Sequence, residues 1–451
     1  MSKRIEQYFD KYLNGVSHVT LNPGGPGCIR IHLVPPKSPV KDPSVVFLNG
    51  MDIIPLNHSW AILLNCLIRE INPYHGHEIT EKDYISIVDK AVSNAKKVFP
   101  LTRRNKLQKD LSTIMTVITE IAYGQKPSMD VGQLSIGEYA DKMKAPHRMD
   151  FMVTAMTKDG KWHCNQKCVH CYAAGQHEAE VTELDTEHCI EVIKKLQTIG
   201  IPQITFTGGE PTMRKDLPEL VKAASWFVTR LNTNGINMTP ELCRQLALAS
   251  LDSVQITFYS DNEDVHNTLV GAKMYSKTFE GIKNAIDAGL AVSINTPLCT
   301  LNKDYVSTLK CLHELGVEYV TCSALIMTGN ACTEKSKSTQ LSNEELLQIL
   351  KDAVAYCNEN QMEISFTSPG WIDEEEVLNL GLMAPSCGAC LSNMAIAPNG
   401  DIVPCQSWLS DKPLGNILRD DWADVWESAN CKEHRDYSAQ LTGKCPLRNG
   451  N

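Results

Sequence analysis

The region between residues 149 and 325 most constrains the fold, because short strand-like runs alternate there with helical patterns. Six strands are expected, over residues 149–156, 203–207, 227–232, 253–259, 290–297 and 319–325. Helices are expected between them, over residues 186–199, 216–225, 240–249, 278–288 and 303–315. Strands that alternate with helices form a parallel sheet. Six such units are too few for a closed eight-stranded barrel, so the pattern predicts an open, partial TIM-type (β/α)6 barrel in an α/β protein.

Composition and charge argue against several classes of protein. The chain of 451 residues is 43% hydrophobic and 21% charged, which is typical of a soluble globular protein with more than one domain. Its net charge of −10 argues against a general nucleic-acid binder. The N-terminus has no signal-peptide pattern, and the apolar run at residues 61–68 is too short to span a bilayer. Seventeen cysteines without an export signal indicate reduced thiols and metal ligation, so a cytoplasmic location is expected.

A loop after the first expected strand carries Cys164, Cys168 and Cys171 at C-x3-C-x2-C spacing. Cysteine thiolates at such short spacing are ligands of iron–sulfur clusters. Three thiols leave one coordination position open for another ligand. A zinc site completed by His163 or His170 is the alternative from spacing alone. The loop follows a strand end, the place where catalytic groups gather in barrels of this kind.

The second expected strand is followed directly by Gly208-Gly209-Glu210-Pro211-Thr212. Two glycines let the backbone approach a ligand closely, and a carboxylate can accept a hydrogen bond from an amino group. The cysteine loop, Tyr172 after it and this turn one unit later together resemble the radical S-adenosylmethionine (radical SAM) superfamily over residues 149–330. Weaker matches follow at residues 232–235, His266-Asn267, Gly271 and Asn302. A zinc site would not require the glycine turn, so the combination of motifs favours an iron–sulfur cluster over zinc.

The resemblance implies a cofactor set and a mechanism. Cys164, Cys168 and Cys171 would bind three irons of a 4Fe–4S cluster, and the fourth iron would take the amino and carboxylate groups of S-adenosylmethionine. An electron from a donor such as flavodoxin or ferredoxin would then give a 5′-deoxyadenosyl radical, which removes hydrogen from a C–H bond. The expected S-adenosylmethionine contacts are Tyr172, Gly208, Gly209, Glu210, Pro211, Asn232, Thr233, Gln255 and Asn295.

The first hundred residues predict a small α+β domain. Asn49-Gly50 between apolar runs at residues 45–48 and 51–54 indicates a hairpin with a type I′ turn. Helices are expected over residues 2–14, 59–71 and 81–98. This winged-helix-like arrangement over residues 1–100 resembles the PqqD-like leader-recognition domain of enzymes that mature ribosomally made peptides. It would take the leader peptide as an added strand at the hairpin edge, and a plain capping domain is the alternative.

The remaining segments complete the expected domain order. Residues 101–145 are expected to form a helical linker and residues 146–335 the barrel. In residues 336–451, Cys390-x9-Gly400-x4-Cys405 resembles the opening of a SPASM extension. Five cysteines are too few for the two clusters of a full SPASM domain, so the shortened twitch form with one auxiliary 4Fe–4S cluster is expected. Its expected ligands are Cys387, Cys405, Cys445 and either Cys390, favoured by spacing, or Cys431; a zinc ribbon is the alternative.

The resemblance implies a radical SAM enzyme that cross-links or oxidises an amino-acid residue of a peptide. Three alternatives remain: a small-molecule dehydrogenase, a peptide epimerase and a non-catalytic iron–sulfur sensor. An epimerase needs a thiol that returns a hydrogen atom, and Cys322 and Cys332 near barrel strand ends are the candidate catalytic residues, with Cys299. Neither a nucleic acid nor a membrane is expected as a partner.

Overall fold

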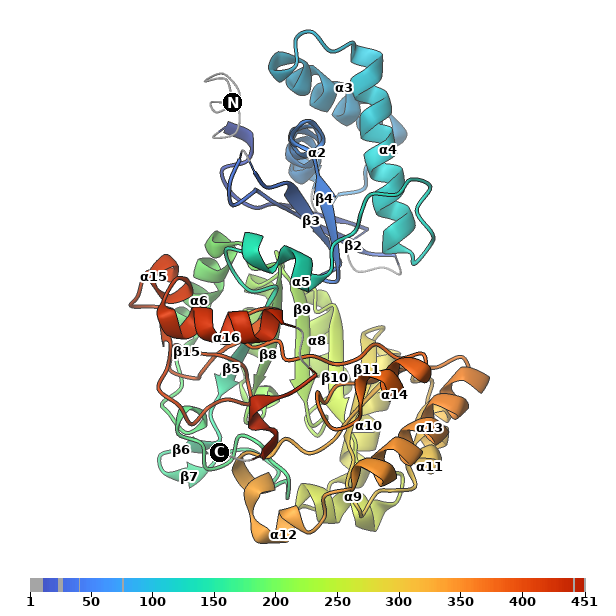
Figure 1. Cartoon of the computed structure of the whole chain (residues 1–451), viewed down its shortest axis with the longest axis vertical. Helices are drawn as coiled ribbons and strands as arrows, with labels where there is room; N and C mark the ends of the chain where they lie inside the picture. Colours follow the sequence, from blue (N-terminus) through green and yellow to red (C-terminus); the bar gives the residue numbers. More distant parts are fainter. Residues whose placement is uncertain (1–10, 23–26, 40, 75–76, 441–442, 450–451) are drawn as a thin grey trace. The chain divides into compact units, whose positions relative to one another are not determined.

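The computed structural model describes residues 11–22, 27–39, 41–74, 77–440 and 443–449. The chain divides into two compact units, residues 1–147 with 196–202 and residues 148–195 with 203–451 (Figure 1). The helix expected over residues 2–14 lies mostly outside the described residues. No helix within the described ranges is both long and apolar enough to cross a membrane.

The N-terminal unit contains an antiparallel sheet whose strands follow one another in chain order. These are β1 (Ser17–Leu21), β2 (Ile29–Val34), β3 (Ser44–Leu48) and β4 (Asp52–Leu56). The expected hairpin is β3–β4: Asn49 and Gly50 have φ angles of 52° and 69°, and the Met51 N–H donates to the Leu48 carbonyl at 3.0 Å. Positive φ at both central residues is the type I′ geometry. Strands β1 and β2 were not expected, because polar side chains such as Arg30 and His32 interrupt their apolar pattern.

Three helices pack with this sheet into one hydrophobic core. They are α2 (His58–Ile71), α3 (Glu81–Val98) and α4 (Arg104–Ala122). The Thr80 hydroxyl and the Asp83 carboxylate form a capping box that fixes the start of α3. Helix α4 lies in the stretch expected as a linker, and its Leu107, Leu111 and Ile114 side chains belong to the same core as the sheet. A short helix, α5 (Ile136–Tyr139), follows.

A ten-stranded sheet forms the centre of the second unit. Its parallel strands include the six expected ones, β5 (Arg148–Thr154), β8 (Gln203–Gly208), β9 (Val228–Thr233), β10 (Ser253–Thr257), β11 (Ala291–Pro297) and β12 (Tyr319–Ser323). On one side β13 (Glu363–Phe366) adds to β12; on the other β14 (Asn393–Ile396) pairs in parallel with β5. Strands β15 (Asp401–Val403) and β16 (Gly415–Asn416) complete this side in antiparallel orientation. The expected α/β class with a central parallel sheet is confirmed.

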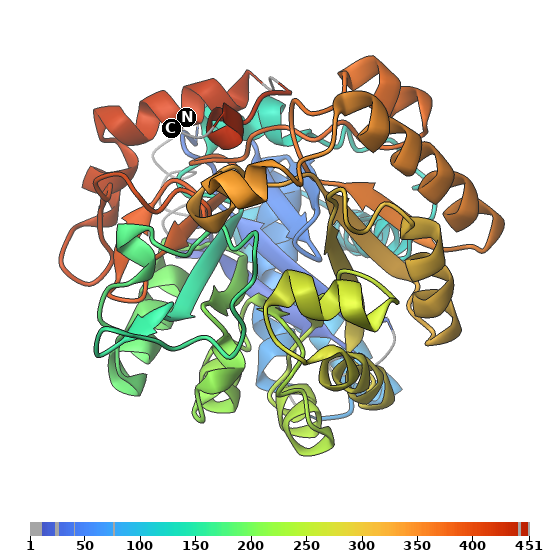
Figure 2. The same ribbon diagram turned by 90° about the horizontal axis from the view of Figure 1, so that it is seen from below.

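Helices cover the outer face of this curved sheet, in green to orange in Figure 2. They are α6 (Thr186–Ile199), α7 (Leu217–Ala223), α8 (Pro240–Leu248), α9 (Glu263–Val270), α10 (Tyr275–Asp287), α11 (Tyr305–Glu314) and α13 (Asn343–Glu359). Strand side chains alternate between the two faces of a sheet. Ile204, Leu231 and Ile256 are therefore fully buried, whereas their polar neighbours Thr205, Asn232 and Gln255 line a cavity on the inner face.

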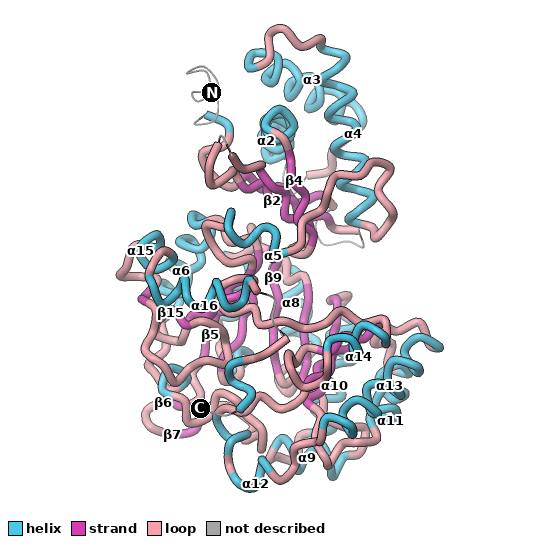
Figure 3. The backbone as a smooth tube through the Cα atoms, in the orientation of Figure 1, coloured by secondary structure: helices cyan, strands magenta, loops and turns pink. Residues whose placement is uncertain are grey.

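The remaining β-strands and α-helices of this unit contain between two and eleven residues. They are β6 (Thr157–Lys158), β7 (Lys161–Trp162), α12 (Glu334–Lys337), α14 (Glu374–Asn379), α15 (Trp422–Trp426) and α16 (Ala429–Ala439). Between α14 and α15 the chain is mostly irregular, as the pink tube in Figure 3 shows. This irregular segment carries Cys387, Cys390 and Cys405.

Candidate functional site

The lead-in to the cysteine loop is a small hairpin formed by β6 and β7. Asp159 and Gly160 turn it with φ angles of 51° and 68°, the same turn chemistry as in the N-terminal hairpin. After the hairpin, the Trp162 indole N–H donates to the Gln166 carbonyl at 2.7 Å. This bond folds the chain back on itself around Cys164. Residues 157–163 therefore shape the start of the loop.

The cysteine loop is held by backbone hydrogen bonds to later parts of the barrel. The Lys167 and Val169 N–H groups donate to the Val270 and Leu269 carbonyls at 3.0 and 2.9 Å, at the end of α9. The Asn330 N–H donates to the Cys171 carbonyl at 2.9 Å from a short 3-10 helix, Gly329–Cys332. These bonds fix the backbone on both sides of Cys168.

Cys164, Cys168 and Cys171 line one cavity of about 530 Å³ on the inner face of the sheet. Burial raises the pKa of Cys164 to about 12, and burial together with the charges of the other two thiols raises that of Cys168. Three partly buried thiols whose charges oppose one another are held as thiolates only beside a positive centre. The donor set therefore fits three irons of a cluster. Within the described residues no three His, Cys, Asp or Glu side chains converge on a single ion. In a four-iron cluster each of the three thiols would instead bind a different iron.

Gly208 and Gly209 are required by the close approach of β5 to β8. A side chain at Gly208 would overlap the Thr154 carbonyl, and a Cβ at Gly209 would lie 2.5 Å from the Ala155 carbonyl oxygen. Gly208 also has a φ angle of 140°, which L-residues with side chains rarely adopt. The Gly209 carbonyl accepts a hydrogen bond from the Cys164 thiol at 3.3 Å, so the turn lies directly against the cysteine loop.

The Glu210 carboxylate links the ends of β8 and β9. It accepts hydrogen bonds from the Thr212 N–H and hydroxyl at 3.0 and 2.5 Å, from the Thr233 hydroxyl at 2.6 Å and from the Asn234 N–H at 2.8 Å. Burial raises the pKa of Glu210, although these hydrogen bonds oppose the shift. Glu210 lines the cavity, as expected, but its carboxylate already accepts two hydrogen bonds from its own turn and two from the end of β9. Pro211 starts a short 3-10 helix and is not among the cavity-lining residues.

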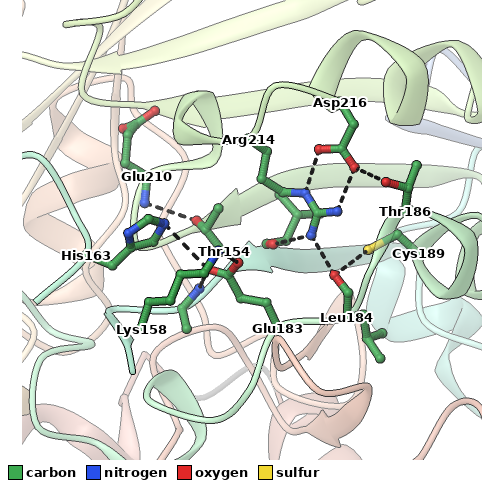
Figure 4. A network of polar contacts seen from close by, with 12 residues as sticks. Thr154, Lys158, His163, Glu183, Leu184, Thr186, Cys189, Glu210, Arg214 and Asp216 are labelled. Atoms are coloured by element: carbon green, nitrogen blue, oxygen red, sulfur yellow. Dashed lines mark hydrogen bonds and ion pairs between the residues drawn. The ribbon is translucent and has the colours of Figure 1, made fainter. Parts of the chain in front are cut away.

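Arg214, which was not predicted from the sequence, lies beside the turn that contains Gly208, Gly209 and Glu210 (Figure 4). Arg214 donates to the Val153 and Leu184 carbonyls at 3.0 and 2.8 Å and forms a two-pronged ion pair with Asp216, with distances of 2.9 and 2.6 Å. The arginine hydrogen bond lowers the pKa of Asp216 to about 2. Nearby, the Ala155 N–H donates a hydrogen bond to the Glu183 carboxylate at 2.9 Å. The end of β5 is thus fixed where it meets Gly208 and Gly209.

The structure brings the expected polar residues of the later strands together in the cavity. Its lining includes Tyr172, Asn232, Thr233, Gln255 and Asn295. The Gln255 amide donates to the Thr321 hydroxyl at 3.1 Å, and that hydroxyl donates to Asn295 Oδ1 at 2.9 Å. The lining also contains Arg148, Arg230 and Tyr319, which sequence reasoning missed. Arg230 lies two residues before the expected Asn232 on the same strand, which was the available signal for it. Arg148 and Tyr319 lie on strands where no polar contact was expected.

The C-terminal cysteines separate into two groups. Cys387, Cys405 and Cys445 line the same cavity as the cysteine loop. Burial, with the charges of Cys387 and Cys445, raises the pKa of Cys405 to about 12. Cys390 and Cys431 are fully buried, are hydrogen-bonded to each other and are not among the lining residues. Arg435 donates to the Cys431 sulfur at 3.6 Å. The negative charge of Cys405 contributes to raising the pKa of Cys390.

The structure does not bring the three candidate hydrogen-donor thiols to the cavity. Cys322 lies on β12 between Thr321 and Ser323, which face the cavity, so its own side chain points to the opposite face. Burial and the neighbouring Cys357 of α13 raise the pKa of Cys322 to about 12. The Cys332 thiol donates to the Met327 carbonyl at 2.8 Å, and Cys299 is fully buried. None of the three is among the lining residues.

Two protein families match the chain. Residues 163–312 match the Radical SAM superfamily, and residues 387–446 match SPASM, an iron-sulfur cluster-binding domain. The first match contains the cysteine loop and Gly208–Glu210; the second contains all five C-terminal cysteines. The expected cofactors, S-adenosylmethionine, a 4Fe–4S cluster and auxiliary iron–sulfur binding, are confirmed by these matches. The leader-recognition domain stays a prediction.

Curated relatives match about three fifths of the chain. The chain is 30% identical over 285 residues to sporulation killing factor maturation protein SkfB of Bacillus subtilis (strain 168), covering 60% of this chain and 66% of that protein. It is 26% identical over 305 residues to the AdoMet-dependent heme synthase of Methanosarcina barkeri (strain Fusaro / DSM 804), covering 63% and 85%. The crystal structure of Streptococcus suis SuiB bound to precursor peptide SuiA has the same fold, with a TM-score of 0.57, 14% identity and coverage of 87% and 86%.

Proposed function

Because the chain belongs to the radical SAM superfamily and carries a SPASM domain, we propose that it modifies a peptide, removing a hydrogen atom from one amino-acid residue to give a cross-linked or oxidised product. One observation carries this proposal. A single cavity of about 530 Å³ is lined by the cysteine loop and by Cys387, Cys405 and Cys445. A substrate side chain in this cavity lies between the two sets of cluster ligands.

The chain's own residues would position the reactants. When bound, the cofactors supply a 5′-deoxyadenosyl radical and an acceptor for the electron left on the product. Cys164, Cys168 and Cys171 would hold the first cluster, and Gly208–Glu210 would present the backbone of the turn to S-adenosylmethionine. Asn232, Gln255 and Asn295 would orient the cofactor or the substrate by hydrogen bonds from the cavity wall. Residues 336–451 would hold one auxiliary cluster through Cys387, Cys405, Cys445 and Cys390.

A peptide substrate is supported by the relatives. SkfB is named as a maturation protein, and SuiB, which shares the fold, was solved with a precursor peptide. The N-terminal unit would bind the leader segment as an added strand. An electron donor such as flavodoxin or ferredoxin would reduce the first cluster.

The edges of the N-terminal sheet limit where a leader strand can bind. At β4, the Leu134 N–H already donates to the Ile53 carbonyl at 2.9 Å, and Pro55 has no N–H to offer. At β1, the Asn72 side chain donates to the His18 carbonyl at 3.0 Å. A leader therefore competes with one intramolecular contact at either edge. Hydrogen–deuterium exchange of residues 17–21 and 52–56 would identify the edge that a peptide protects.

A small-molecule substrate is the second candidate function. It is favoured by the 26% identity to a heme synthase. The two candidates differ in what the N-terminal unit does: a leader-binding domain is needed only for a peptide.

The test uses the full chain, purified anaerobically with its clusters, together with S-adenosylmethionine and dithionite. Candidate peptides are those encoded beside its gene. We expect 5′-deoxyadenosine and a peptide product that has lost two hydrogens, detected by mass spectrometry. Cys168→Ala should abolish both, whereas Cys243→Ala, which alters a buried thiol on α8, should retain both.

Two results would count against the proposal. Absence of 5′-deoxyadenosine from cluster-loaded protein contradicts radical chemistry. Formation of 5′-deoxyadenosine with every neighbouring peptide unmodified, and with no peptide protecting the N-terminal sheet, favours the small-molecule substrate instead.

A further inference from the structure

Two arginines and one carboxylate lie together on the inner face of the sheet. Arg148 begins β5 and Asp150 follows two residues later; Arg230 is on β9, with β8 between the two strands. The register places Asp150 opposite Thr205 and Thr205 opposite Arg230. Arg148, Thr205 and Arg230 all line the cavity.

The carboxylate is already committed to one of the two arginines. Arg148 Nε lies 2.8 Å from Asp150 Oδ1, and Arg148 Nη2 donates to Oδ2 at 3.2 Å. The Asp150 side chain is only 1% exposed, so water does not replace this partner. The two charges offset each other in this pair, although Arg148 Nε and Asp150 Oδ1 are not aligned as a hydrogen bond.

Arg230 lacks an equivalent partner. Its Nη2 donates to the Ser293 hydroxyl at 3.3 Å, while its Nε is buried without a hydrogen-bond partner. In the part of the chain that the structure describes, no carboxylate forms an ion pair with Arg230. Burial and the nearby charge of Arg148 both lower the pKa of Arg230. A partly buried guanidinium that shares the single carboxylate of Asp150 with Arg148 is incompletely neutralised, so the cavity here is complementary to an anion.

Unsatisfied polar atoms surround the same place. Thr205 Oγ1 and Asn232 Oδ1 are buried without hydrogen-bond partners, and both residues line the cavity. The Tyr319 hydroxyl donates to the Ser365 hydroxyl at 3.2 Å and fixes the Tyr319 ring at the cavity wall. Arg230 is therefore surrounded by groups that can hydrogen-bond a polar ligand.

We propose that Arg230, with Arg148 beside it, binds a carboxylate of the substrate inside the cavity. This inference rests on the proposed function, and it narrows the substrate to one that places an acidic side chain or a C-terminal carboxylate next to the reacting residue. Arginine is suited to this role because its planar fork matches both carboxylate oxygens. The carboxylate of S-adenosylmethionine has the same chemistry, so the test separates the two sources.

The test measures binding, which does not require turnover. The probes are N-acetyl-L-glutamate α-methylamide, its glutamine counterpart, N-acetyl-L-alanine and S-adenosylmethionine, each titrated calorimetrically into cluster-loaded full chain. Either the glutamate probe or N-acetyl-L-alanine should bind at least about tenfold more tightly than the glutamine probe, because a hydrogen bond to a charged group is worth about 1.5–3 kcal/mol. Tighter binding of the glutamate probe would identify a side-chain carboxylate as the ligand, and tighter binding of N-acetyl-L-alanine would identify a C-terminal carboxylate.

Arg230→Gln should remove this preference, and Arg230→Lys should retain part of it, because the charge remains without the fork. Both variants should bind S-adenosylmethionine within about twofold of wild type. The matched control is Arg244→Gln, since Arg244 is exposed and pairs with Glu241 on α8. Iron content and the thermal midpoint report whether each variant folds. If Arg230→Gln does not fold, Arg230→Lys still tests whether the arginine fork is needed for the preference.

Equal binding of acid and amide probes to the wild type would overturn the inference. So would a loss of S-adenosylmethionine affinity that matches any loss of probe affinity, because the anion would then be the cofactor. Failure of the proposed function is a separate result: wild-type protein that binds the acid probe but forms no 5′-deoxyadenosine with dithionite contradicts the enzyme activity and leaves the carboxylate site standing.

Discussion

Gly271 lies directly against the backbone carbonyl of Lys167, so closely that any side chain at residue 271 would overlap that oxygen. Gly271 ends α9 with a φ angle of 66°, and the Val270 carbonyl just before it accepts the Lys167 N–H at 3.0 Å. The helix end and the cysteine loop are thus joined through backbone atoms alone. The position of Cys168 depends on the absence of a side chain more than a hundred residues later.

We expect Gly271→Ala to displace the cysteine loop and lower the iron bound per chain. Gly289→Ala is the matched control, because Gly289 has a φ angle of 75° but open space around it. Both variants should lose about 1 kcal/mol from the left-handed backbone conformation. Only Gly271→Ala should lose iron and the further stability that comes from the Lys167 contact. Equal iron content and equal melting temperatures in the two variants would contradict this account.

His266 should make stability depend on pH below neutrality. Burial lowers the pKa of His266 to about 4, and its ring packs 4.9 Å from that of Phe258. The unfolded chain takes up a proton below its ordinary value of 6.5, whereas the folded chain does not. The stabilisation is therefore present above about pH 6.5 and is lost as pH falls toward 4, by about 2 kcal/mol between about pH 7 and about pH 5.

The measurement is the melting temperature of wild type and His266→Phe across this pH range, both with clusters. The difference between them should shrink as the pH falls. His188→Gln is the control: His188 is exposed, and its hydrogen bond to Asp185 raises the pKa of His188, so its contribution is lost as pH rises. A wild-type profile parallel to that of His266→Phe would show that His266 does not titrate in this range.

Arg214→Lys should destabilise the protein by about 3 kcal/mol, because lysine cannot reach two carbonyls and both oxygens of Asp216 at once. The Arg214 side chain is only 10% exposed. Arg244→Lys is matched in chemistry, but that pair is about 60% exposed on both sides and should cost under about 0.5 kcal/mol. Chemical denaturation of both variants provides the measurement. Equal effects of the two substitutions would show that the Arg214 network does not stabilise the turn.

The fourth auxiliary ligand can be identified by counting iron. We expect Cys390→Ala to lose about four irons per chain, the content of one cluster, and Cys431→Ala to retain them. The reason is that the negative charge of Cys405 acts on Cys390, which indicates that these two thiols are near each other. The Cys431 sulfur, in contrast, accepts a hydrogen bond from Arg435. Cys405→Ala should behave like Cys390→Ala, and Cys243→Ala should lose none. Loss of iron from Cys431→Ala alone would reverse the assignment.

Much of the fold could be predicted from local patterns in the sequence. The helix expected over residues 186–199 is α6 with the same bounds, and β8 to β12 begin within one residue of their expected starts. Helical periodicity, alternation and Asn-Gly turns are properties of neighbouring residues, so they can be recognised without knowing the partner. The two families and the cofactors follow from motifs of the same local kind.

Pairings between distant segments depended on the tertiary structure. Nothing near Asn393 indicates that β14 pairs with β5, yet this pairing brings Cys387 and Cys405 to the cavity that Cys164 lines. Similarly, Cys322 was expected near the reacting centre, and the strand's alternation turned it to the other face.

The amino-acid sequence by itself determined the alternation of strands and helices over residues 149–325, the cysteine spacing and the family. Only the tertiary structure decided that Arg230 on β9 lies two strands from Asp150 and forms no ion pair of its own, because sheet register sets which side chains of separate strands face each other. Register results from the packing of the whole sheet, and no short stretch of sequence contains it.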